Sequence, residues 1–272
     1  MSMSMSMCSP HIGGKICYSK NDLLYIARLY NKYTTNKIHL SKLTKSQLWK
    51  TLHERFKNLC DHQLCWIEQK YIPKHFYEKT KGKFKPKMPN SWFENINEWL
   101  STLEIEDVMN QYDQKYKKFK FLGAVPSDCP KSITCSLSNL NIKSYLKNNI
   151  TKIGVIFNLD EHHQSGSHWV ALMIDLGQKC VSFYDSNGVG PNKNILHFIE
   201  DILKKMKLHF KKKIKYNVNK KEHQRTNSEC GMFSMLFLIN YLKYNNFKKV
   251  IDLNPTDKKM TILRKVLFIP KK

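Results

Sequence analysis

The sequence predicts an α/β (α+β) fold: a small mixed sheet flanked by helices, with one central buried helix, preceded by a helical arm. Residues 232–239 are apolar on every side, so a helix formed there has to be buried. Strand patterns follow one another between residues 153 and 184. Residues 19–69 show helical periodicity instead.

Composition divides the chain of 272 residues into four parts. Residues 1–12 are a Met/Ser-rich tail that we expect to be disordered. Residues 13–72 form the expected helical arm. Residues 73–90 combine prolines and a glycine with many lysines, which predicts a solvated basic linker. Residues 91–272 form the expected main domain.

The net charge of +24 comes almost wholly from lysine, because only four of the 46 basic residues are arginines. Two interpretations stay open. A lysine-rich surface can bind a polyanion such as DNA without sequence preference. The same excess, beside abundant Asn and Ile, is what an A/T-biased coding sequence would produce.

The eight cysteines include no Cys-x-x-Cys pair, and the Met/Ser start has neither the charge nor the apolar centre of a signal peptide. We therefore expect free thiols in a reducing intracellular compartment. Cys60, His62 and Cys65 resemble half of a zinc site, but no second ligand pair follows at finger spacing. We expect no metal and no cofactor. Apolar runs fall short of the roughly 20 residues that a membrane span needs.

The helical arm is predicted from three segments. Residues 19–33 carry an apolar stripe behind Ser19, which can cap a helix. Residues 41–57 repeat the pattern, and a shorter helix is expected over 60–69.

In the main domain, residues 105–116 and a segment from Pro191 to about residue 207 predict helices. Strands are expected over 153–159, 168–176, 180–184 and 214–218, with a last edge strand over 264–269.

Cys230 stands where a polar, turn-prone segment runs into the apolar helix. A thiol at a helix N-terminus is favoured as thiolate by the unpaired N–H groups and the helix dipole. Gly231 has no side chain, so a substrate could approach the sulfur closely. Taken alone, the segment equally fits a buried core cysteine.

His168 and Asp185 provide a partner for that cysteine. A hairpin turning at Leu176-Gly177 would place them directly opposite each other on one sheet face. A carboxylate there would hold one imidazole nitrogen and leave the other free to take a proton. Asn187 would replace Asp185 if the register slipped, and Asp175 is the weaker candidate.

Gln224 lies six residues before Cys230. Its side-chain amide could meet a developing oxyanion together with the backbone N–H of Cys230. Nucleophile, base, orienting acid and oxyanion donor then occur together, which is the pattern of acyl-transfer chemistry at a thiol.

The motifs Gly-Ser-His168-Trp169, Tyr-Asp185-Ser and Gln224-x5-Cys230-Gly231 closely resemble the Ulp1- and adenain-type cysteine peptidases. That group includes the SUMO-deconjugating proteases and the adenovirus processing protease. Trp99-Leu100-Ser101 resembles the group's Trp-Leu-Asn-Asp motif, although Ser101 and Thr102 replace its two polar residues.

The resemblance implies roles for these residues: Cys230 as nucleophile, His168 as base, Asp185 as its orienting acid and Gln224 as oxyanion donor. It also implies that Trp99 and Trp169 flank a narrow channel that admits only glycine before the scissile bond, with Gly231 beside it.

The general layout is most similar to thiol proteases of large nucleocytoplasmic DNA viruses. This resemblance implies cleavage of structural precursors after Gly-Gly or Ala-Gly during maturation, in the virion and the viral factory of the host cytoplasm. DNA could guide such a protease to its substrates. Removal of ubiquitin-like modifiers, or a basic scaffold protein with a decayed site, are the alternatives. Gly13-Gly14 reads either as a hinge or as a self-processing site.

Overall fold

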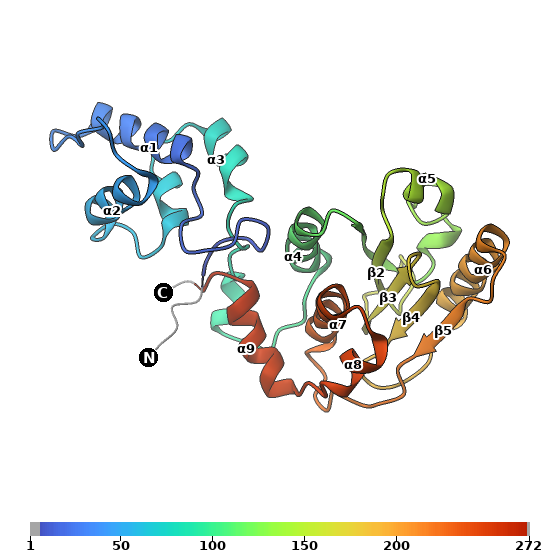
Figure 1. The fold of residues 1–272 in the computed structure, drawn as a ribbon. Helices are drawn as coiled ribbons and strands as arrows, with labels where there is room; N and C mark the ends of the chain where they lie inside the picture. The colour runs from blue at the N-terminus through green and yellow to red at the C-terminus, as the bar shows by residue number, and fades with distance from the viewer. Residues whose placement is uncertain (1–5, 271–272) are drawn as a thin grey trace. The chain divides into compact units, whose positions relative to one another are not determined.

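A computed structural model describes residues 6–270 of the chain and divides it into two compact units. The first unit comprises Met1–Met88 together with Val266–Lys272, and the second is Pro89–Lys265. The two units are described separately below, with the elements labelled as in Figure 1.

The first unit is helical, as predicted. Ser19 caps the first helix and Thr44 the second, each in a capping box with the residue three positions later. Of the helix expected over residues 60–69, only Gln63–Ile67 form a short 3₁₀ helix. The elements are α1 (Lys20–Tyr33), α2 (Lys45–Phe56), η1 (Gln63–Ile67) and α3 (Lys74–Lys81).

The prediction of a solvated basic linker at residues 73–90 is wrong, because residues 73–88 belong to the first unit. This segment contains α3, and its apolar side chains Phe76, Phe84 and Met88 are buried. Tyr18 packs edge-on against Phe84, with ring centroids 5.1 Å apart. Lysines dominate the composition, but the few apolar residues at intervals decide the packing.

Residues 1–5 of the expected disordered tail lie outside the described residues, while residues 6–12 are built into the first unit. Cys8 is buried, pairs with Cys17 in a disulfide and forms an isolated β-bridge with Phe84. The backbone N–H of Ser9 donates to the carbonyl of Lys83 at 2.9 Å. The prediction of disorder rested on the Met/Ser composition, which does not show these contacts.

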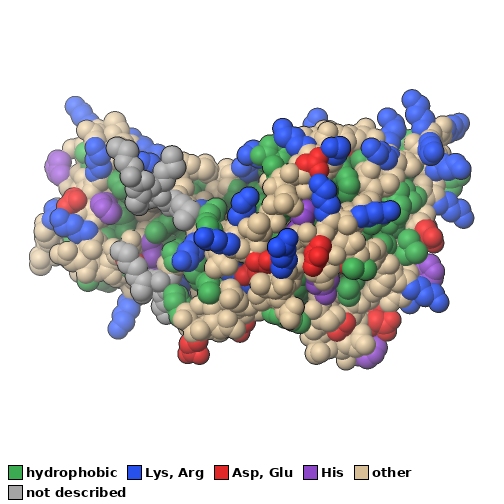
Figure 2. All heavy atoms as spheres, turned by 90° about the horizontal axis from the view of Figure 1, so that it is seen from below, with side chains coloured by type: hydrophobic (Ala, Val, Ile, Leu, Met, Phe, Trp, Pro, Cys, Tyr) green, Lys and Arg blue, Asp and Glu red, His purple; other side chains and the backbone are tan. Residues whose placement is uncertain are grey.

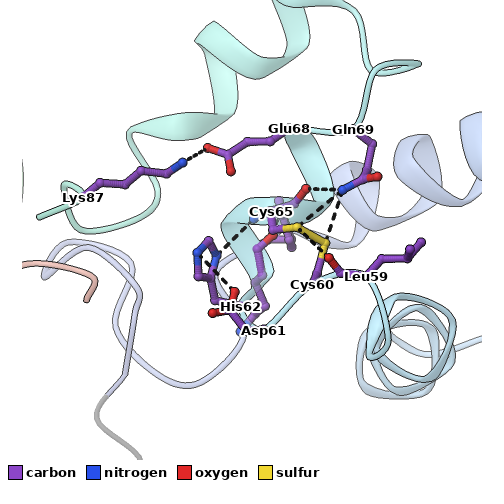
Figure 3. The surroundings of a disulfide bond; sticks show 10 residues. Leu59, Cys60, Asp61, His62, Cys65, Glu68, Gln69 and Lys87 are labelled. Carbon is purple, nitrogen blue, oxygen red and sulfur yellow. Dashed lines mark hydrogen bonds and ion pairs between the residues drawn. A yellow bond between two sulfur atoms is a disulfide. The ribbon is translucent and has the colours of Figure 1, made fainter. Parts of the chain in front are cut away.

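The expectation of free thiols is also wrong for six of the eight cysteines. The pairs are Cys8–Cys17, Cys60–Cys65 and Cys129–Cys135. Figure 3 shows that Cys60 and Cys65, considered as zinc ligands, are joined to each other, with the Gln69 amide donating to both sulfurs. Cys180 and Cys230 remain free.

The second unit is built on a five-stranded mixed sheet in the order β1-β2-β3-β4-β5. The outer pairs β1/β2 and β4/β5 are parallel, and the central pairs are antiparallel. The strands are β1 (Phe119–Pro126), β2 (Lys152–Asn158), β3 (Trp169–Asp175), β4 (Cys180–Tyr184) and β5 (Lys215–Val218).

Helices cover both faces of this sheet (Figure 1). On one face, Ile153, Val155 and Phe157 of β2 share a core with α6. On the other, α7 packs against β3, and Ser234 of α7 donates to the Trp169 carbonyl at 3.0 Å. The helical segments are η2 (Asn90–Phe93), α4 (Thr102–Lys115), η3 (Cys129–Lys131), α5 (Ile142–Lys147), α6 (Lys193–Phe210), α7 (Cys230–Tyr244), α8 (Phe247–Asp252) and α9 (Asp257–Leu267).

Two of the strand assignments differ from the prediction. Strand β1 was missed, because it is interrupted by a register shift between Phe121 and Ala124 that breaks the alternation. The expected edge strand over 264–269 is wrong: residues 264–267 are the end of helix α9, which buries Met260, Arg264 and Leu267 on one face. Beyond the helix, Ile269 forms only an isolated β-bridge with Lys87. Figure 2 shows Lys and Arg side chains scattered over the visible face. Among the described residues, no helix is long and apolar enough to cross a membrane.

Candidate active site

Cys230 is the first residue of α7, the central helix predicted from its apolar sequence. Ten of the fifteen residues of α7 are buried, so the helix is held from all sides. Cys230 itself is only 2% exposed and is not part of a disulfide. The first turn of a helix presents unpaired N–H groups and a positive dipole end, which favour negative charge on a thiol there.

His168 and Asp185 lie in contact, with His168 Nε2 2.6 Å from Asp185 Oδ1. The side chain of Cys230 is the second group that acts on the imidazole, and it raises the pKa of His168. Since Nε2 faces the carboxylate, Nδ1 is the ring nitrogen left for the sulfur. Both partners of the imidazole are nearly buried, at 2% exposure for Asp185 and 2% for Cys230.

The hairpin that led to this pair has a different register from the predicted one. Asp175 pairs with Cys180, so the loop has four residues and not two. Lys179 closes it in the left-handed region at φ 57°, and Asp175 Oδ1 accepts the N–H of Gln178 at 2.8 Å.

This pairing, continued, would bring Asn187 opposite His168. The ladder however stops at Ala171 and Tyr184, so His168 and Asp185 lie just beyond the strand ends, where the pairing no longer fixes side-chain positions. Asp185 is therefore the partner of His168 although the predicted register is wrong. Asp175 lies at the far end of the hairpin.

Three surroundings act on the pKa of His168. Burial disfavours the imidazolium, but the hydrogen bonds to Asp185 and Cys230 and the charges of both groups outweigh it and raise the pKa to about 9. The imidazole is therefore held in its protonated form near neutral pH.

Gln224 is buried, and both ends of its amide are held. Ser186 Oγ donates to Gln224 Oε1 at 2.8 Å, and Gln224 Nε2 donates to the Thr226 carbonyl at 2.5 Å. The Ser186 carbonyl also accepts the backbone N–H groups of His223 and Gln224. Ser186 directly follows Asp185, so one turn orients both the acid and the glutamine.

Protein side chains fill the space beside Gly231, and its place next to the substrate stays a prediction. A Cβ at Gly231 would lie 2.9 Å from Leu100 Cδ1 and 3.3 Å from Trp169 Cδ1. The indole N–H of Trp169 donates to the Leu100 carbonyl at 2.9 Å and locks the two together. Leu100 and Trp169 thus pack directly against the turn that follows Cys230.

Trp99 and Trp169 line one groove of about 460 Å³, together with Leu100, Asn158, Asp160 and Gly166. Trp169 is buried, whereas Trp99 is 47% exposed and free to meet a ligand. Ser101, which replaces a polar residue of the motif, caps α4 in a capping box with Glu104. Its role is therefore explained by the helix that it starts.

Residue patterns alone missed two contributors. Ser186 stands in the Tyr-Asp-Ser motif, but only the structure shows that its hydroxyl fixes the Gln224 amide. Leu100 lay inside the Trp-Leu motif, and no role was predicted for it. Within residues 6–270 there is no group of three or more His, Cys, Asp or Glu side chains that could hold a metal.

A thiol at a helix N-terminus, a protonated imidazole beside it and a carboxylate behind the imidazole can carry out nucleophilic acyl transfer. These features, on a mixed sheet with a central helix, define a cysteine protease.

Comparison with known proteins gives the family. A sequence profile of the Ulp1 protease family, C-terminal catalytic domain, matches residues 109–271. R355 of Acanthamoeba polyphaga mimivirus, named as a thiol protease, is 31% identical over 290 residues, covering 97% of this chain and 93% of the relative. The chain belongs to the Ulp1 protease family.

A more distant relative has the same fold. S273R of African swine fever virus, named as a SUMO-1 cysteine protease, is 23% identical over 268 residues, which is 87% of this chain and 93% of the relative. The crystal structure of the pS273R protease superposes with a TM-score of 0.69 at 19% identity, covering 98% of this chain and 96% of that one.

Proposed function

We propose that this cysteine protease is an endopeptidase that cleaves viral structural precursors after Gly-Gly or Ala-Gly during virion maturation. The observation that carries the peptidase chemistry is the imidazole of His168, held between Asp185 at 2.6 Å and the thiol of Cys230. Viral relatives of nearly equal length support the setting.

In the proposed reaction, Cys230 Sγ attacks the scissile carbonyl and forms a carbon–sulfur bond. His168 Nδ1 gives its proton to the departing amine as the carbon–nitrogen bond breaks. Water then attacks the thioester while His168 accepts its proton and the carbon–sulfur bond breaks. The acid is released, and the thiolate of Cys230 is restored beside the imidazolium of His168. Asp185 keeps the imidazole oriented throughout, and Gln224 with the Cys230 N–H stabilises the oxyanion.

The packing around the nucleophile supports small residues next to the scissile bond. Leu100 and Trp169 fill the space at Gly231, and Cys230 is only 2% exposed. A substrate residue with a Cβ would have to compete with these side chains for the same volume. Glycine, or alanine one position further away, avoids that competition.

The alternative within the same chemistry is removal of ubiquitin-like modifiers, which also end in Gly-Gly. It is favoured by the name of the African swine fever virus relative, a SUMO-1 cysteine protease. A modifier carrying a C-terminal electrophile discriminates the two, because a deconjugating enzyme would be trapped covalently at Cys230. A scaffold with a decayed site is disfavoured by the intact contacts of His168 and Asp185.

The deciding experiment incubates the protein with candidate capsid precursors and maps the new N-termini by mass spectrometry. Cleavage after Gly-Gly or Ala-Gly is expected with the unaltered protein, and none with Cys230→Ser or His168→Ala. Both variants should keep the circular dichroism and melting temperature of a folded protein. Cleavage by either folded variant would overturn the assignment of nucleophile or base.

The net charge of +24 supports a second part of the proposal, nonspecific DNA binding at the place of action in the virion and the viral factory. The lysines are scattered over the face in Figure 2, which suits a diffuse electrostatic contact more than a groove. Binding of duplex DNA should weaken steeply as salt rises. Binding that is independent of salt would contradict it.

A further inference from the structure

Helix α9 contacts the catalytic loop, residues 224–230, at both ends. Asp257, the first residue of α9, accepts the backbone N–H of Arg225 at 3.1 Å and the hydroxyl of Thr226 at 2.9 Å. Seven residues later, Arg264 Nε donates to the carboxylate of Glu229 at 3.1 Å. The first pair of contacts directly follows Gln224 in the sequence, and the second contact directly precedes Cys230.

The spacing of the two residues suits this task. Positions seven apart lie on the same face of a helix, about 10 Å from each other along its axis. Met260 and Arg264 on that face are buried. The helix therefore supports the loop at both of its ends, whereas residues 225–227 of the loop are exposed to solvent.

Arg264 also reaches the other wall of the site. It is fully buried, its Nη2 donates to the Glu98 carbonyl at 2.8 Å, and its guanidinium lies 4.5 Å from the ring centroid of Trp92. Glu98 immediately precedes Trp99 and Leu100, the residues that pack over Gly231 or line the groove. One side chain thus ties the nucleophile turn to the opposing segment.

Asp257 acts on the oxyanion side. Thr226, whose hydroxyl it holds, offers its carbonyl to Gln224 Nε2 at 2.5 Å. Ser186 holds the other end of the same amide. The position of the Gln224 N–H group therefore depends on Thr226, and the position of Thr226 depends on α9.

We infer that Asp257 and Arg264 of α9 are positioning residues for catalysis. They fix the distance between the side-chain amide that stabilises the oxyanion and the helix turn that carries the nucleophile. This inference rests on the proposed roles of Gln224 and Cys230. It assigns to a helix outside the sequence motifs a part of the transition-state geometry. Neither residue need touch the substrate.

Asp257→Ala is the sharpest test, because the residue is only partly buried and the variant should fold. We expect kcat to fall by about tenfold, since an oxyanion donor is misplaced and not removed. KM and the alkylation rate of Cys230 by iodoacetamide should stay unchanged, because neither needs the oxyanion donor. Asp257→Asn, which keeps an acceptor oxygen, should recover most of the activity.

Asp201→Ala is the matched control, since it removes a carboxylate that pairs with Lys205 on α6. Backbone hydrogen exchange over residues 224–230 provides a readout that requires no substrate, and it should accelerate in Asp257→Ala alone. Exchange and kcat equal to those of the control would overturn the inference. Failure of the unaltered protein to cleave any substrate would overturn the proposed function instead, while the exchange result still decides the role of α9.

Discussion

At the scale of single residues, the protonation of His168 controls the chemistry. Its pKa of about 9 in the folded protein lies above the ordinary value near 6.5 for an exposed histidine. The imidazolium therefore contributes stability that is fully present below about pH 6.5 and is lost as the pH rises through about 9. The proton that must reach the leaving amine disappears over the same interval.

We predict that kcat/KM of the unaltered protein declines on the alkaline side with an apparent pKa of about 9. Asp185→Asn removes the carboxylate that raises the pKa of His168, so this decline should move to lower pH. Activity at pH 7 should fall by about tenfold to hundredfold, less than for loss of the base itself. A pH–rate profile of both proteins measures this, and an unmoved alkaline limb would exclude His168 as its origin.

Gly231→Ala tests the packing around the nucleophile. The added Cβ would lie 2.9 Å from Leu100 Cδ1, so Leu100 or Trp169 must shift. We expect a destabilisation of about 1–3 kcal/mol, measured by denaturant unfolding, and a loss of cleavage. In a Leu100→Ala background the same substitution should cost less. Equal costs in both backgrounds would show that Leu100 is not the obstacle.

The residue scale also shows why part of the site could be predicted and part could not. His168 and Asp185 were paired by a two-residue turn that does not exist, yet both leave their strands at the same end of one hairpin. Two residues at the same end of a hairpin remain close to each other even when the predicted register is wrong by two residues. The packing role of Gly231 involves Leu100, which is distant in sequence, and no local pattern reports such a contact.

At the scale of elements, the pair Glu229–Arg264 joins α9 to the start of α7. Both side chains are at most 2% exposed. Arg264→Met should destabilise the protein by about 3–5 kcal/mol, because it leaves a buried carboxylate without its partner. The double variant Glu229→Gln/Arg264→Met should recover much of that loss. Thermal and denaturant unfolding measure both, and a double variant no more stable than the single one would contradict this account.

The end of helix α9 was mistaken for part of a strand because residues 266–269 are apolar in succession, and this run covers the last two residues of the helix and the two that follow. A short apolar run fits a strand or the buried end of a helix equally well, and only its context decides. The helical repeat is present further upstream in Met260, Arg264 and Leu267, but a buried arginine conceals it. In α7 the run was long enough to exclude a strand, so that helix was predicted correctly.

At the scale of the whole molecule, the cysteines permit a direct chemical count. Thiol titration of the denatured protein without reductant should detect two groups, Cys180 and Cys230, and eight after reduction. Cys230→Ser should lower each count by one. Eight reactive thiols in freshly purified, unreduced protein would show that the three disulfides are not formed.

The chain ends in the unit in which it began. Val266–Lys272 belongs with Met1–Met88, Ile269 packs in the apolar core of that unit, and the backbone groups of Ile269 bond to Pro86 and Met88. The catalytic unit is thus an insertion within a discontinuous domain. Removing the first 88 residues would strip Ile269 of its partners and leave an apolar tail directly after α9. A stand-alone protease should accordingly be cut at both ends, near residues 89 and 265.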